Sequence, residues 1–168
     1  MIENDAVVIV LLMGTAGSGK TTVGELLASQ LGWEFADGDS FHSPANIEKM
    51  SCGLPLNDAD RIPWLNSIRE AMEQWIVQRR NVVLACSALK KSYRERLQMN
   101  SGVKLVYLKG SYGLLRERLH ERKGHYATEQ LLASQFADLE EPTDAITIDV
   151  ARTLEEIVTE IRKQLALA

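Results

Sequence analysis

One segment constrains the fold of this 168-residue chain more than any other, the sequence GTAGSGKT at residues 14–21. It matches the pattern G-x-x-x-x-G-K-[ST], whose glycines let the backbone turn so tightly that successive N–H groups converge on phosphate oxygens. A continuous apolar run precedes it at 6–13, and a helical pattern follows it at 20–31. A buried strand, a glycine loop and a helix in this order predict a site for the phosphates of a nucleotide.

In this motif the lysine reaches the β- and γ-phosphates, and the hydroxyl of the next residue coordinates Mg²⁺. Lys20 and Thr21 occupy these two positions. We expect the nucleotide to be bound by Gly14, Gly17, Ser18, Gly19, Lys20, Thr21 and Thr22. The sequence contains no Asn-Lys-x-Asp motif, the pattern with which GTPases recognise guanine, so ATP is favoured over GTP.

Short apolar segments alternate with helical patterns along the rest of the chain. Four further strands are expected, at 33–36, 82–86, 103–108 and 145–150. Helices are expected at 20–31, 43–50, 60–79, 114–122, 128–139 and after Thr153. Asp58 is the expected cap of the helix near 60–79. This alternation predicts an α/β fold, a parallel sheet with helices on both faces, in a single domain of residues 1–168.

Polar residues follow two of the expected strands. Asp37 and Asp39 come directly after the second strand, where one carboxylate can hold Mg²⁺ and the other can accept a proton from a substrate hydroxyl. A simple Asp-Gly turn with solvated carboxylates is an equal alternative, and His42 fits a loop or cap as well as a site. Ser87 and Lys90 end the next strand, where open α/β sheets bind ligands. A lysine at a helix start opposes the helix dipole, so we expect an anion at Lys90.

Two arginines on an expected helix offer further positive charge. Arg118 and Arg122 are four residues apart and so share one face of a helix. They fit a lid helix over a nucleotide, and a hinge-like turn follows at 123–125. The alternative is a surface helix in which Glu117 and Glu121 pair with them.

The charge distribution limits the classes of partner. The net charge is −4, yet residues 61–123 hold 14 of the 19 Lys and Arg residues and only 5 of the 23 Asp and Glu residues. The overall acidity argues against nucleic acid and anionic membranes as partners, and the basic middle fits a small anion. Cys52 and Cys86 show no metal or CxxC spacing, which predicts reduced thiols in a cytoplasmic protein. The apolar run at 7–13 is too short to span a membrane.

Several segments together resemble the gluconate kinases (gluconokinases) over about residues 6–160. They are GTAGSGKT at 14–21, DGDSFH at 37–42, NIEKM at 46–50, NDADRIPWL at 57–65, CSALKKSYR at 86–94, RKGH at 122–125 and QF at 135–136. The resemblance implies ATP-dependent phosphorylation of D-gluconate at its 6-hydroxyl, giving 6-phosphogluconate. It also implies the P-loop kinase fold of shikimate and nucleoside monophosphate kinases, a five-stranded sheet of order 2-3-1-4-5 with a helical lid at about 116–142.

The same resemblance implies roles for single residues. Arg118 would stack on adenine and Arg122 would contact the phosphates, while Asp37 would sit near Mg²⁺ and Asp39 near the acceptor hydroxyl. The residues expected to line the sugar-acid site are Asp39, His42, Arg61, Ser87, Lys90 and His125. Those expected to act in catalysis are Lys20, Asp39 and Arg122. A homodimer is expected, because family members are often dimers.

Two other functions stay open at this point. One is another small-acceptor kinase such as a shikimate kinase, which shares the paired aspartates but lacks the NDADRIPWL segment found here at 57–65. The other is a nucleotide-binding switch that binds ATP without transferring its phosphate. Turnover stimulated by an acceptor distinguishes a kinase from such a switch.

Overall fold

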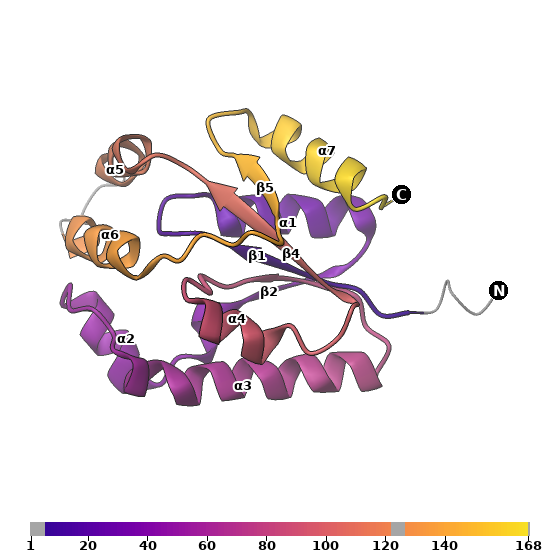
Figure 1. The fold of residues 1–168 in the computed structure, drawn as a ribbon, viewed down its shortest axis with the longest axis horizontal. Helices are drawn as coiled ribbons and strands as arrows, with labels where there is room; N and C mark the ends of the chain where they lie inside the picture. The colour runs from indigo at the N-terminus through magenta and orange to yellow at the C-terminus, as the bar shows by residue number, and fades with distance from the viewer. Residues whose placement is uncertain (1–5, 122–126, 168) are drawn as a thin grey trace.

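The computed structural model describes residues 6–121 and 127–167 (Figure 1). Its strands are β1 (Ile9–Met13), β2 (Glu34–Asp37), β3 (Val82–Ala85), β4 (Val103–Lys109) and β5 (Ile146–Asp149). They form one five-stranded parallel sheet in the order β2-β3-β1-β4-β5. The α/β fold and the strand order implied by the resemblance are therefore confirmed.

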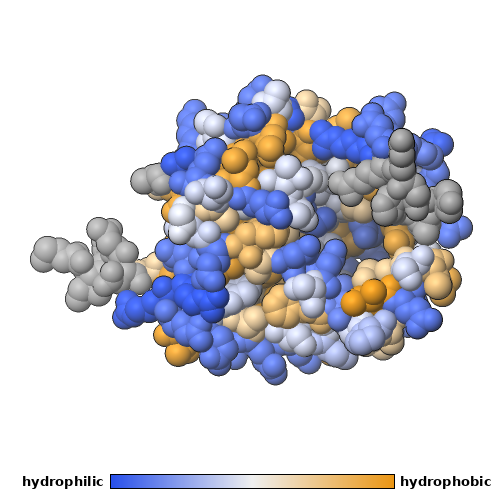
Figure 2. Space-filling model, turned by 180° about the vertical axis from the view of Figure 1, so that it is seen from behind, coloured by the Kyte–Doolittle hydropathy of each residue, from blue (hydrophilic) through white to orange (hydrophobic). Residues whose placement is uncertain are grey.

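Helices cover both faces of this sheet (Figure 1). They are α1 (Lys20–Leu31), α2 (Pro44–Ser51), α3 (Asp58–Val77), α4 (Lys91–Leu97), α5 (Tyr112–His120), α6 (Ala127–Asp138) and α7 (Leu154–Gln164), with a 3₁₀ turn, η2, at Gly38–Phe41. One core lies between the sheet and α3 and α4, and a second lies between the sheet and α1, α5 and α7. Hydrophilic side chains cover much of the face seen from behind, with apolar patches between them (Figure 2).

The central strand β1 explains why its sequence is apolar without interruption. All five of its residues are buried. Ile9, Leu11 and Met13 pack into the core under α3, whereas Val10 and Leu12 pack into the core under α1. A strand buried on both faces needs apolar side chains at every position. The glycine loop directly follows this buried strand, so the packing of β1 fixes where the loop begins.

Several helix boundaries differ by one or two residues from those expected, and α4 is not among the expected helices. Asp58 does not cap α3, because Asn57 precedes the helix and its side chain accepts from the Asp60 backbone N–H (2.8 Å). The Asp60 carboxylate accepts in return from the Asn57 N–H (3.0 Å), so a complete capping box begins the helix at Asp58, two residues before the expected start. Helix α5 ends at His120, two residues before the expected end.

The carboxyl ends of the strands point to one side of the molecule, where α2, α5 and α6 lie (Figure 1). The loops after β1, β2 and β3 all emerge on this side, because parallel strands end at the same edge of a sheet. Within residues 6–121 and 127–167, no helix has the length and apolar character to cross a membrane.

Candidate active site

The glycine loop between β1 and α1 has the backbone conformation that its sequence predicts. Gly17 (φ 81°) and Gly19 (φ 90°) lie in the left-handed region, which other L-residues rarely adopt, and Gly19 immediately precedes α1. Lys20 Nζ donates to the carbonyl oxygens of Gly14 (2.9 Å) and Thr15 (3.1 Å). The ammonium is thereby held against the loop at the positive end of the α1 dipole, a suitable place for phosphate.

A cleft beside this loop collects most of the residues expected to bind the nucleotide. Its lining includes Gly17, Gly19, Lys20, Thr21, Thr22, Asp37 and Asp39. Gly14 and Ser18 do not line it. The Ser18 hydroxyl is buried with no hydrogen-bond partner in the described part of the chain, and the Ser18 N–H donates to the Thr15 carbonyl (3.2 Å). Ser18 therefore lies inside the loop and shapes it.

Thr21, in α1, and Asp37, in β2, both line this cleft. One Asp37 oxygen accepts from the Asp39 backbone N–H (2.9 Å). Among the residues that the structure describes, no group of three His, Cys, Asp or Glu side chains could enclose a metal ion. Mg²⁺ commonly uses one or two carboxylates, waters and substrate phosphates, so a hydroxyl and a carboxylate beside the phosphate loop fit it.

A second cleft brings together four residues expected to bind the acceptor, namely Asp39, His42, Arg61 and Ser87. They come from η2, the loop before α2, the first turn of α3 and the loop after β3. Apolar and polar neighbours complete the lining, among them Pro55, Leu56, Trp64, Leu131 and Gln135. The two clefts share Ala16, Lys20 and Asp39, so they meet where the lysine and the carboxylate stand.

Asp39 lies at this junction. Its side chain is 74% exposed, but protein surrounds the cleft in which it stands. Desolvation by these surroundings and the negative charge of Asp37 raise the pKa of the Asp39 carboxyl, while Lys20 opposes the shift. A carboxylate with a raised pKa binds a proton more readily than one in bulk water, and Asp39 is thus suited to accept one.

His42 forms part of the wall of the acceptor cleft. Its side chain is 4% exposed, and its ring stacks on Trp64 with 4.3 Å between centroids. Burial, together with the positive charge of Arg61, lowers the pKa of His42 to about 4. The imidazole is therefore neutral near pH 7 and acts through hydrogen bonds rather than through charge.

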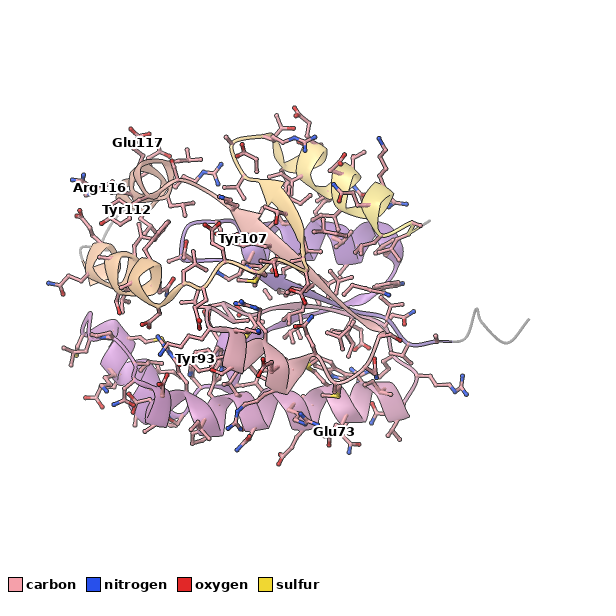
Figure 3. The ribbon with its side chains drawn as sticks, in the orientation of Figure 1. Glu73, Tyr93, Tyr107, Tyr112, Arg116 and Glu117 are labelled. Carbon is pink, nitrogen blue, oxygen red and sulfur yellow. The ribbon has the colours of Figure 1, made fainter. Side chains whose placement is uncertain are left out.

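The cationic residues of the acceptor side already have partners within the chain. Arg61 Nη1 donates to the Tyr93 hydroxyl (3.1 Å) and to Asp138 Oδ2 on α6 (2.9 Å). Lys90 does not line the cleft, and its Nζ binds Asp58 Oδ1 (2.9 Å). The expected anion at Lys90 is thus a carboxylate of the protein itself. These contacts gather around Tyr93, which is labelled in Figure 3.

Arg118 lies between the phosphate loop and the segment that follows β5. Its guanidinium donates to the carbonyl oxygens of Gly17 (3.5 Å) and Val150. These partners are backbone carbonyls, not the carboxylates of Glu117 or Glu121, so the alternative of a surface salt-bridge row does not describe Arg118. Arg122 and His125 lie outside the described residues.

Some residues that shape the site had no role assigned from the sequence. Gln135 Oε1 accepts from the Ala16 N–H of the phosphate loop (2.7 Å), which ties α6 to that loop. Arg94, 4% exposed, donates to the carbonyls of Ala88, Leu89 and Glu140 and so holds the loop after β3. Asn46 is buried against His42. Each stands inside a resembling segment, but only the fold shows what it contacts.

Comparison with known proteins agrees with this geometry. Residues 16–166 match the family model described as shikimate kinase. A probable gluconokinase of Mus musculus is 43% identical over 94% of this chain and 97% of its own length. The thermoresistant gluconokinase of Escherichia coli K12 is 45% identical over 89% of each chain.

A solved structure of a gluconokinase from Sinorhizobium meliloti 1021 superposes with a TM-score of 0.85. It is 44% identical and covers 96% of this chain and 92% of that one. Sequence identity of this degree over nearly the whole chain is far higher than that of proteins that share only a fold. The chain therefore belongs to the gluconokinase family of shikimate-kinase-like P-loop kinases.

Proposed function

We propose that this chain transfers the γ-phosphoryl group of ATP to the 6-hydroxyl of D-gluconate, giving ADP and 6-phospho-D-gluconate. Membership of the gluconokinase family supports the substrate pair. The observation that carries the proposal is the junction of the two clefts at Lys20 and Asp39. Phosphoryl transfer needs its donor, its acceptor and a positive charge within reach of one another, and this junction supplies that arrangement.

On the nucleotide side, Lys20 and the loop N–H groups would bind the β- and γ-phosphates, and Thr21 and Asp37 would hold Mg²⁺. When bound, Mg²⁺ neutralises charge on the phosphates. Arg118, beside the loop and the segment after β5, would lie against adenine. Arg122 and His125 would act from the lid at about 116–142, where closure would exclude water and suppress hydrolysis of ATP.

On the acceptor side, the hydroxyl oxygen of gluconate would attack the γ-phosphorus while its proton passes to the Asp39 carboxylate. The bond between the γ-phosphorus and the leaving oxygen of ADP would break. Arg61 is the charged group of the cleft best suited to the gluconate carboxylate, because a guanidinium binds a carboxylate through two parallel hydrogen bonds. Ser87 and His42 offer polar contacts to the other hydroxyls.

A coupled assay of ADP production tests this proposal. Gluconate, shikimate, nucleoside monophosphates and other sugar acids would be compared at equal concentrations, with and without Mg²⁺. We expect gluconate, and none of the other acceptors, to stimulate ADP production strongly, and we expect this activity to require Mg²⁺. Turnover of shikimate or a nucleotide without gluconate would overturn the substrate. ATP binding without stimulation by any acceptor would instead indicate a switch.

A further inference from the structure

The two ring nitrogens of His42 face different surroundings. The ring lies nearly parallel to Trp64 (12°), and the Trp64 Nε1–H donates to the Gly38 carbonyl (2.7 Å). The plane of the imidazole is thereby fixed. Nδ1 faces Asn46 on α2, whereas Nε2 faces the acceptor cleft, 3.9 Å from Asp39 Oδ1.

Asn46 determines which of these nitrogens can carry the hydrogen. Its Nδ2 donates to the Asp60 carbonyl oxygen (2.9 Å) and lies 3.3 Å from His42 Nδ1. A carbonyl oxygen only accepts, so turning the amide by 180° would place two acceptors against each other. The second N–H of Nδ2 therefore points to His42 Nδ1, which must accept it.

A neutral imidazole that accepts at Nδ1 carries its hydrogen on Nε2. The lowered pKa of His42, caused by burial and the charge of Arg61, keeps the ring in this neutral form near pH 7. The Nε2–H group thus presents a donor to the acceptor cleft. If the hydrogen were on Nδ1, the lone pair of Nε2 would face the Asp39 carboxylate and the oxygens of any bound hydroxyl compound.

We propose that Asn46 is a positioning residue for the phosphoryl acceptor, holding His42 as the Nε2–H tautomer so that the ring donates a hydrogen bond to a hydroxyl oxygen of the sugar acid beside Asp39. The inference rests on the acceptor site proposed above. Asn46 lines neither cleft and acts only through His42. Its loss should therefore weaken binding of the acceptor and leave binding of the nucleotide unchanged.

Steady-state kinetics of Asn46→Ala and Ser43→Ala separate this role from a structural one. Ser43 caps α2 by accepting from the Asn46 backbone N–H (3.2 Å), so its loss loosens the same helix but leaves the Asn46 amide in place. We expect Asn46→Ala to raise the KM for gluconate about tenfold, the effect of one ordinary hydrogen bond, and to leave the KM for ATP unchanged. Equal changes in both constants, or the same change in Ser43→Ala, would overturn the proposal.

Two replacements of His42 itself give a second readout. The amide nitrogen of glutamine reaches the place of Nε2, whereas that of asparagine reaches only the place of Nδ1. We therefore expect His42→Gln to retain a larger kcat/KM for gluconate than His42→Asn. Equal losses in the two variants, or better retention by His42→Asn, would count against a donor at Nε2.

The tautomer can be observed directly by long-range ¹H–¹⁵N NMR of the ¹⁵N-labelled full chain without substrate. The chain has three histidines, and the signals of His42 are those missing from the spectrum of His42→Gln. We expect hydrogen on Nε2 alone in the natural protein and a mixture of tautomers in Asn46→Ala. Hydrogen on Nδ1 of the natural protein would overturn the proposal. Because no substrate is present, this result is separate from any failure of the gluconate assay.

Discussion

The two clefts of this enzyme are built in different ways. The nucleotide cleft comes mainly from one continuous segment, residues 16–22, whose backbone conformation depends on its own glycines. The acceptor cleft is assembled from η2, α2, α3, the loop after β3 and α6, which are far apart in the sequence. A local site depends on its own sequence, whereas an assembled site depends on the contacts that hold its parts together.

Those contacts are long-range hydrogen bonds on the acceptor side. The Trp64 indole binds the Gly38 carbonyl across 26 residues, Arg61 binds Asp138 across 77, and Arg94 binds the Glu140 carbonyl across 46. Substitutions in the two regions should therefore differ in kind. Changes in the loop should remove activity from a folded protein, and changes behind the acceptor cleft should lower stability and acceptor affinity together.

The largest expected effect follows from Lys20→Ala. The lysine is shared by both clefts and supplies positive charge at their junction, so its loss should lower kcat by about a thousandfold. Coupled measurement of ADP production gives the rate, and Lys104→Ala, an exposed change on β4, is the matched control. Turnover near that of the natural protein would show that the loop is not the active site.

A smaller loss is expected from Asp39→Asn, which removes a proton acceptor but keeps the size of the side chain. We expect kcat to fall by about a hundredfold, with the Kd for ATP unchanged when measured by calorimetry. Asp37→Asn should instead raise the Mg²⁺ concentration needed for activity. A large loss of ATP affinity with normal transfer in Asp39→Asn would exchange the roles given to the two carboxylates.

Arg94→Leu tests the assembled region through its stability. The change removes three hydrogen bonds of a buried side chain, although the Leu89 carbonyl still accepts from the Glu140 N–H (2.9 Å), and we expect the free energy of unfolding in urea to fall by about 3 kcal/mol. The KM for gluconate should rise as the loop carrying Ser87 loosens. Arg96→Leu on the same helix removes an exposed side chain and should change neither quantity. Equal effects of the two variants would show that Arg94 does not stabilise the acceptor cleft.

The last expected effect is a dependence of stability on pH that arises from His42, and it should leave activity at pH 7 unchanged. Its pKa is about 4 in the folded protein and about 6.5 when unfolded, so the unfolded chain binds more protons between these values. Stability present above pH 6.5 is therefore lost as the pH falls toward 4, by at most about 1.4 kcal/mol per pH unit. When measured by urea unfolding between pH 7 and pH 4, the free energy of unfolding should fall less steeply in His42→Gln than in the natural protein. Identical slopes would mean that His42 does not titrate this way.

The same contrast explains what the sequence could predict. The strands, the start of α1 at Lys20 and the phosphate loop follow from local patterns, because apolar periodicity and glycine placement act over a few residues. The strand order came from the resemblance and agrees with the structure. The residue types alone place the cap of α3 one residue too late, since Asn57 and Asp58 are both good caps by residue type.

The partners of the acceptor residues could not be predicted in the same way. The sequence marks Lys90 and Arg61 as cations that need an anion, but the carboxylates that meet them come from Asp58 and Asp138, 32 and 77 residues away. Such pairings depend on how α3, α4 and α6 pack. The relation between Asn46 and His42 likewise needs the Asp60 carbonyl, which only the folded chain brings to the amide.

The ion pair between Arg61 and Asp138 has a consequence for the choice of substrate. An acid bound at Arg61 as proposed above would meet a guanidinium whose charge is already compensated by Asp138, so it would have to share or displace that carboxylate. Its net gain is the difference between two similar ion pairs, and a neutral sugar has no group to offer in this exchange. In the acceptor site proposed above, discrimination between a sugar acid and a sugar would therefore be set by this competition, not by the full strength of one charge contact.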